Sequence, residues 1–137
     1  MPQPGQILWY KDFPFEDHTK KDKLFVALND ADTDSLCLVL KTTSQSRRYE
    51  GVEKGCNPQK KVFFVPIVWE QCFKRDTYIQ LPEITEIPIE KLLVGDISGK
   101  IYVSSSLSAD CFAQLKDCLK QFREDISAQH WKLIFQS

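Results

Sequence analysis

Short apolar runs separated by polar stretches fill the first two thirds of the chain. Residues 24–28 read LFVAL and residues 36–40 read LCLVL, which is the length and composition of buried β-strands. Residues 77–81 read TYIQL, in which apolar and polar side chains alternate as they do in a half-buried strand. The same criteria predict further strands at residues 6–10, 62–68, 84–87 and 100–103. We therefore expect a sheet of roughly five to seven strands, mainly antiparallel.

The apolar period becomes helical after Ser108. Ser108 can cap a helix, and Asp110 in the first turn favours the helix dipole. One face of that helix is apolar, and it carries Cys111, Phe112, Leu115, Cys118, Leu119, Phe122 and Ile126. We expect a helix at about residues 108–126, with an apolar tail at 127–137 that packs on the body or on a second subunit. A shorter helix is expected from Pro88, because proline suits the first helical turn.

These elements predict an α+β fold in a single domain spanning residues 1–137, with the sheet curled into a small β-barrel. The amino-terminal residues lack a signal-peptide pattern, and no apolar run has the length of a membrane span. The 5 cysteines are odd in number and form no CxxC pair, so we expect reduced thiols in a cytoplasmic protein. Their spacing does not match a zinc site, and we expect neither a metal nor another cofactor.

Positive charge is concentrated in one part of a chain whose net charge is −1. Residues 41–61 carry six basic against two acidic side chains, whereas residues 1–40 and 62–137 are each net negative. The same part contains a run of hydroxyl and amide side chains, Thr42 to Ser46, followed by Arg47 and Arg48. A guanidinium group presents a fork of donors that fits a phosphate, so this turn is a candidate site for an anionic ligand. The alternative is an ordinary solvated loop.

Several short strings, in their order, resemble the MazF/PemK-like toxins. The opening strand PGQILW at residues 4–9, the segment DFPF at 12–15 and the string LVLKTTS at 38–44 carry the resemblance. The layout of the second half, from TYIQL at 77–81 to the helix after Ser108, is also similar. The resemblance implies an SH3-like antiparallel β-barrel with a long C-terminal helix, dimeric, that cleaves single-stranded RNA without a metal. It also implies an antitoxin protein as partner.

Carried over by position, the resemblance assigns catalytic roles to four residues. Thr43 and Ser44 match the family's hydroxyl pair, and His18 lies where some members place a loop histidine. Lys23 precedes the second strand, where the family has an Arg-Pro pair that this chain lacks. Contacts to RNA are assigned to the surrounding polar and basic side chains, Lys20, Lys21, Lys41, Gln45, Arg47 and Arg48.

The missing arginine keeps other functions open. Lysine is a point charge rather than a bidentate fork, so the chain could be a binding module that has lost catalysis. A third hypothesis is a poison of a protein partner, as in the related CcdB-like toxins, with an exposed Trp131 as the contact. A plain structural domain is the fourth.

Overall fold

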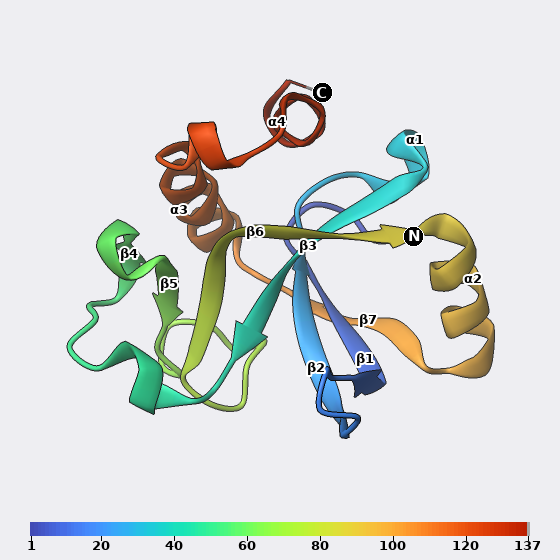
Figure 1. Ribbon diagram of the computed structural model, residues 1–137, viewed down its shortest axis with the longest axis horizontal. Coiled ribbons are helices and arrows are strands. Elements are labelled where there is room, and N and C mark those ends of the chain that lie inside the picture. Colours follow the sequence, from blue (N-terminus) through green and yellow to red (C-terminus); the bar gives the residue numbers. More distant parts are fainter. Residues whose placement is uncertain (137) are drawn as a thin grey trace.

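The computed structural model describes residues 1–136 and contains one seven-stranded sheet in which neighbouring strands are antiparallel (Figure 1). In the order in which they pair, the strands are β4 (Gly55–Asn57), β5 (Val62–Val65), β6 (Thr77–Pro88), β3 (Leu36–Thr43), β2 (Lys20–Ala27), β1 (Gln6–Pro14) and β7 (Ile101–Ser106). The mainly antiparallel α+β prediction is confirmed. In the part of the chain that is described, the sheet is open, with β4 and β7 as its edge strands.

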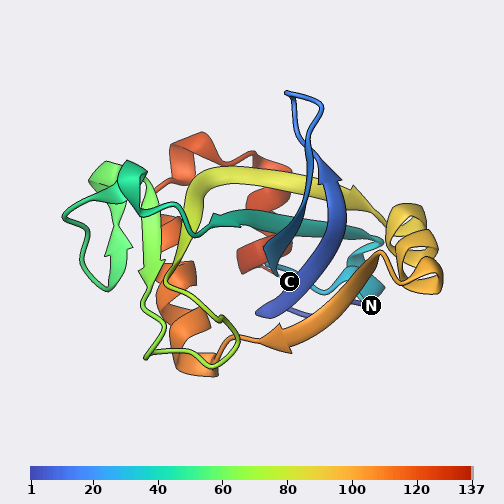
Figure 2. The same cartoon turned by 90° about the horizontal axis from the view of Figure 1, so that it is seen from below.

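Helices lie at both ends of the sheet (Figures 1 and 2). The α-helices are α1 (Ala31–Asp34), α2 (Ile89–Ser98), α3 (Ala109–Lys120) and α4 (Ala128–Phe135), and the 3₁₀ turns are η1 (Ser46–Tyr49), η2 (Pro58–Lys60) and η3 (Arg123–Asp125). In both views α2 lies at one end of the molecule, while α3 lies at the other end beside β4 and β5.

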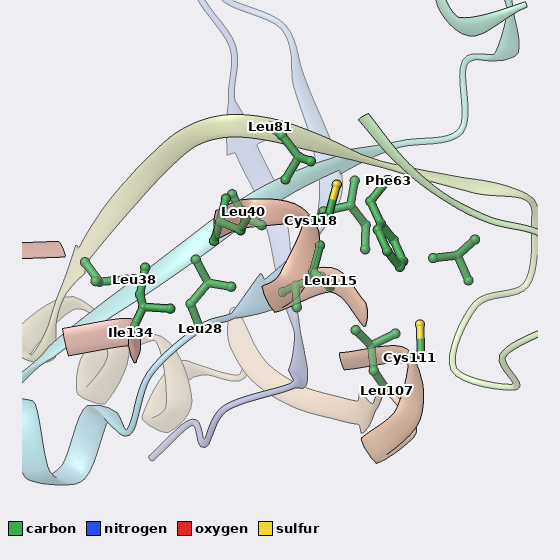
Figure 3. Close-up of a cluster of buried hydrophobic side chains, with 14 of the residues drawn as sticks. Leu28, Leu38, Leu40, Phe63, Leu81, Leu107, Cys111, Leu115, Cys118 and Ile134 are labelled. Atoms are coloured by element: carbon green, nitrogen blue, oxygen red, sulfur yellow. The ribbon is translucent and has the colours of Figure 1, made fainter. Parts of the chain in front are cut away.

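The strands alternate between two apolar cores because successive side chains point to opposite faces of a sheet. One core packs alternate side chains of β1, β2, β3 and β6 against α3 and α4; Leu40, Leu115 and Leu119 lie in it with no exposed surface (Figure 3). The other core lies beneath α2 and includes Phe25 and Val39, which are also fully buried. The central strands are therefore covered on both faces.

The C-terminal region differs from the predicted single helix. Ser108 caps α3 as expected, since its Oγ accepts a hydrogen bond from the Cys111 N–H at 3.1 Å. However, α3 ends at Lys120, and η3 separates it from a second helix. That helix begins because the Oγ of Ser127 accepts a hydrogen bond from the His130 N–H at 3.1 Å. Most of the tail predicted at residues 127–137 is thus α4. The last residue of that tail, Ser137, lies outside the described residues.

Two boundaries near the predicted site also move. Residues 20–23, which precede the strand predicted at residues 24–28, belong to β2 and pair with β1, as in the pairs Phe13–Lys21 and Tyr10–Lys23. Thr42 and Thr43, expected in the turn, are the last two residues of β3. Both errors have one cause: strand pairing needs only backbone hydrogen bonds, so a polar run can continue a ladder that its apolar neighbours begin.

The expectation that all cysteines are free thiols is wrong for two of them. Cys56 of β4 and Cys118 of α3 form a disulfide, with their Cα atoms 5.5 Å apart. Cys37, Cys72 and Cys111 are free, and Cys111 and Cys118 are buried in the core as predicted. Sequence spacing could not reveal this pair, because its members lie 62 residues apart and are brought together only by the packing of α3.

Candidate nucleic-acid interface

The site begins where β2 and β3 end their pairing. The last paired residues are Phe25 of β2 and Lys41 of β3, and the register continues outward from them. Leu24 and Thr42 come next, and the Thr42 hydroxyl donates a hydrogen bond to the Leu24 carbonyl at 2.8 Å. Lys23 and Thr43 are the next residues along the two strands, beyond the last paired positions, and both line the hollows described below. Two of the predicted catalytic residues are therefore held by strands with buried side chains.

A first hollow of about 950 Å³ opens on one side of this pair. Trp9, Leu24 and Thr42 line it from the strands. Further lining residues lie between Gln71 and Thr77, in the connection from β5 to β6 and at the start of β6, and they include Phe73, Lys74 and Arg75. Aromatic and apolar groups thus lie beside cations in this hollow. Such a mixture suits a ligand that combines flat rings with negative charge.

A second hollow of about 900 Å³ opens on the other side. Its cations come from β2, β3, η1 and the segment before β5, and they are Lys23, Lys41, Arg48, Lys60 and Lys61. Tyr49 and Gln80 lie between them, and the Gln80 side-chain amide donates to the Tyr49 hydroxyl oxygen at 3.2 Å. This hollow is therefore more uniformly polar than the first.

Five residues line both hollows, and we call them the ridge: Phe15, Asp17, Lys23, Thr43 and Gln45. The Lys23 ammonium lies over the Phe15 ring, 5.2 Å from its centre. The Gln45 N–H donates to the Thr43 Oγ at 3.2 Å. A ligand that crosses from one hollow to the other must pass the Lys23 and Thr43 side chains.

The two hollows together are strongly positive. Eight basic side chains line them, namely Lys21, Lys23, Lys41, Arg48, Lys60, Lys61, Lys74 and Arg75. Four acidic side chains oppose these cations: Glu16, Asp17, Asp22 and Glu83. The local charge is thus +4 in a chain whose total is −1, so the rest of the surface carries −5. Such a field attracts a polyanion to this face.

Lys23 is the cation whose ionisation is altered by this environment. Burial lowers the pKa of its ammonium group, and the charges of Lys41 and Arg48 lower it further. A larger fraction of Lys23 is then the neutral amine at a given pH than for an ordinary lysine. A neutral amine can accept a proton, so Lys23 has the chemistry of a general base.

The comparisons with known proteins identify the fold. No family model matches the sequence, and no curated protein matches it. Solved structures of the MazE–MazF complex from Deinococcus radiodurans do match the structure. The Form-III crystal gives a TM-score of 0.59 at 12% sequence identity, covering 90% of this chain and 96% of the matched chain. The Form-II crystal gives 0.55 at 12% identity, covering 89% and 94%.

The chain has a MazF-like fold. This confirms the resemblance that the strings at residues 4–9, 12–15 and 38–44 suggested. At 12% identity the likeness establishes the fold and says nothing by itself about activity. The low identity also explains why the sequence comparisons found no match: the chain has a MazF-like arrangement of strands with few residues identical to those of the matched structures.

On the MazF-like fold, the predicted residues separate into two groups. Thr43, Ser44 and Lys23 line the first hollow, as do Lys21 and Gln45, and the second hollow adds Lys41 and Arg48. His18, Lys20 and Arg47 line neither hollow. His18 is exposed at the tip of the β1–β2 hairpin with a φ of 67°, and its N–H donates to the Phe15 carbonyl at 3.0 Å. His18 therefore lies next to Phe15 and Asp17 of the ridge without lining either hollow.

Sequence reasoning missed five contributors: Tyr49, Lys60, Lys61, Lys74 and Arg75. Lys60 and Lys61 belong to the net-positive stretch 41–61, so its charge was a usable signal. Lys74 and Arg75 lie in a net-negative part of the chain and reach the site only through the loop before β6. Among residues 1–136, no three His, Cys, Asp or Glu side chains gather as a metal site. No helix within that range is long and apolar enough to cross a membrane.

Proposed function

We propose that the chain is a metal-independent endoribonuclease of a toxin–antitoxin pair and cleaves single-stranded RNA at the ridge. The observation that carries this proposal is that Lys23 and Thr43 line both of two cation-lined hollows on a MazF-like fold. A flexible single strand can bend over such a ridge, with its phosphates near the cations and its bases near Trp9, Phe15 and Phe73.

In the proposed reaction a ribose 2′ oxygen attacks the adjacent phosphorus. The neutral amine of Lys23 takes the 2′-hydroxyl proton as the new P–O bond forms, which its lowered pKa favours. The hydroxyls of Thr43 and Ser44 donate to the non-bridging oxygens, and Arg48 and Lys21 offset the charge that develops there. The 5′ oxygen leaves with a proton from water. The products are a 2′,3′-cyclic phosphate and a 5′-hydroxyl end.

The partner follows from the same electrostatics. The matched crystals are of MazE–MazF complexes, and we propose that this chain also binds an antitoxin. A net charge of +4 over the two hollows suits an acidic segment that lies across them and excludes RNA. A homodimer, an SH3-like arrangement of the strands in the open sheet, and a cytoplasmic location belong to this proposal as well.

The test is cleavage of a long single-stranded RNA by the purified chain in excess EDTA. Lys23→Met keeps the length of the side chain and removes the amine, so cleavage should fall by about 10²-fold or more. Thr43→Val should also slow cleavage, because the phosphate loses a donor. Lys132→Met, an exposed lysine of α4 that lines neither hollow, is the matched control and should cleave normally.

Two results would contradict the proposal. RNA left intact by the wild-type chain removes the activity altogether. Cleavage by Lys23→Met within twofold of wild type removes Lys23 from the chemistry, and His18→Ala would then show whether the loop histidine takes the proton.

A second candidate function is RNA binding without cleavage. The observation that favours it is Lys23 itself, which stands where the family resemblance implies an arginine and offers a single charge instead of a fork. Binding of RNA that stays intact, together with weaker binding by Lys41→Met, would establish it. The protein-poison alternative predicts an exposed Trp131, whereas this side chain is half-buried: its ring packs on Phe135, and the Arg123 guanidinium lies 4.4 Å from its ring centre.

A further inference from the structure

Residues 46–61 form an arm at one end of the sheet that contains η1, β4 and η2 (Figures 1 and 2). The arm has almost no core of its own, since Gly55 is its one buried residue. β4 is three residues long and pairs only with β5, at the edge of the sheet. A short edge pairing of this kind is weakly stable by itself.

The arm nevertheless supplies much of the second hollow. Arg48, Tyr49 and Lys60 line that hollow from the arm, and so does Lys61 at the arm's last position. The second hollow therefore keeps these four lining residues in place only while the arm is held against β6 and α3.

Two clusters of side-chain contacts hold the arm, one at η1 and one around β4, in addition to the β4–β5 pairing and the hydrogen bond from the Leu81 N–H to the Lys61 carbonyl. Near η1, the Tyr49 ring stacks on the Tyr78 ring with centres 5.2 Å apart, and Tyr78 in turn stacks on Phe64 at 4.7 Å. Near β4, the disulfide joins Cys56 to Cys118, while the Lys54 ammonium lies 4.3 Å from the centre of the Trp69 ring. The disulfide is the covalent contact of the set and ties the arm to a helix that is itself firmly packed.

We propose that the Cys56–Cys118 bond is a thiol–disulfide exchange site whose redox state sets the affinity of the second hollow for a single-stranded polyanion. This inference rests on the proposed function, because it names a regulation of the same site. A reducing dithiol opens the bond and frees the arm. Oxidation of the two thiols restores the bond and the hollow.

The exchange is chemically simple. One thiolate of the dithiol attacks the Cys56 sulfur, and Cys118 leaves as a thiolate. The second thiol of the reductant then attacks the mixed disulfide, so the reductant is oxidised by two electrons and both cysteines of the chain become thiols. Cys56 is the accessible sulfur, because its residue is half-buried whereas Cys118 is 2% exposed.

The three free cysteines do not compete for this chemistry. Burial raises the pKa of the Cys37 thiol to about 12, that of Cys72 to about 11 and that of Cys111 to about 12. Thiolates are the reactive species, so these three remain inert thiols near neutral pH. The Cys56–Cys118 pair is therefore the site of redox chemistry among the described residues.

The effect of reduction is local. The helix α3 keeps its place without the bond, since Leu115 and Leu119 beside Cys118 are fully buried in the core (Figure 3). The arm has no such burial, so its local unfolding becomes easier when the tie is cut. Ordering the arm again then costs part of the binding free energy of any ligand in the second hollow.

The experiment measures binding and arm mobility on the same samples. The probe is a fluorescein-labelled single-stranded 2′-O-methyl RNA, which lacks the attacking hydroxyl and stays intact. Its Kd is measured by anisotropy with oxidised protein and with protein reduced by a soluble phosphine. Amide hydrogen exchange of residues 46–61 is followed in both states. The control is the double variant Cys56→Ser/Cys118→Ser under the same two conditions.

Reduction should raise the Kd by about 5–10-fold and speed exchange in the arm while leaving α3 and the central strands protected. The double variant should bind like the reduced protein and ignore the reductant. An unchanged Kd with an unchanged exchange rate overturns the inference, and so does faster exchange without any loss of affinity. If the oxidised protein binds no RNA, the proposed function fails, and the exchange rates alone decide whether the bond holds the arm.

Discussion

The ridge and the arm line the same hollow, yet they are held in place by different physics. Lys23 and Thr43 of the ridge belong to two eight-residue strands, β2 and β3, that carry fully buried side chains in both cores. The arm rests on a short edge strand, one disulfide and a few side-chain contacts, among them the stacking of Tyr49 on Tyr78. The chemistry is thus assigned to the rigid part, and the adjustable affinity to the part that lacks a core.

The largest expected effect concerns the stability of the buried strands that carry the ridge. Leu40 is fully buried beneath the ridge, so Leu40→Ala should lower the free energy of unfolding by about 2–5 kcal/mol. Val52 of the arm is half-buried, and Val52→Ala should cost less than about 1 kcal/mol. Urea denaturation of both variants measures the difference. Equal losses of unfolding free energy in the two variants would show that the arm unfolds together with the core, and the ridge and the arm would then not differ in stability.

A smaller effect tests the charge that the arm contributes. Lys60→Met removes one cation of the second hollow, so the slope of log K against log salt for single-stranded RNA should fall in magnitude by about 0.7. The binding of a labelled RNA at a series of salt concentrations gives the slope. Lys132→Met should leave it unchanged. An unchanged slope in Lys60→Met would mean that RNA does not enter the second hollow.

The smallest expected effect concerns the free energy of unfolding, which the charge of Lys23 on the ridge lowers. The pKa of Lys23 is lowered in the folded chain, so the unfolded chain binds more protons between the folded and the unfolded pKa. Charged Lys23 therefore destabilises the fold at all pH values below its folded pKa, and the penalty is relieved as the pH rises from the folded to the unfolded pKa. Because Lys23 is partly exposed, the penalty should be below about 1 kcal/mol.

Lys23→Met should accordingly be slightly more stable than wild type near neutral pH, and the advantage should shrink in the alkaline range. Urea midpoints at several pH values measure this, with Lys132→Met as a variant whose difference from wild type stays constant. An advantage that grows with pH would reverse the sign and place an anion, not cations, against Lys23.

Much of the central architecture could be predicted from local pattern. The apolar runs at 24–28 and 36–40 became β2 and β3, and Ser108 capped α3, because burial and capping act over a few residues. The start of β2 at Lys20 and the second helix after Ser127 were missed, because pairing and packing impose structure on segments whose own composition is polar or ambiguous.

The site shows the same division. Lys23, Thr43 and Ser44 could be proposed from their places at strand ends and from family resemblance. His18 could be assigned by resemblance too, but the hairpin tip with its positive φ carries it outside both hollows. Lys74 and Arg75 carried no local signal, since a loop between two strands brings them to the site.

By itself, the sequence determined which segments bury their side chains, and so the antiparallel sheet and the two buried strands whose flanking residues include Lys23 and Thr43. Only the tertiary structure decided that Cys56 meets Cys118, and that Lys60, Lys61, Lys74 and Arg75 join one charged face. The physical reason is range: hydrophobic period and helix capping depend on neighbours along the chain, whereas a disulfide and a charged hollow depend on distances that exist only after the sheet has folded.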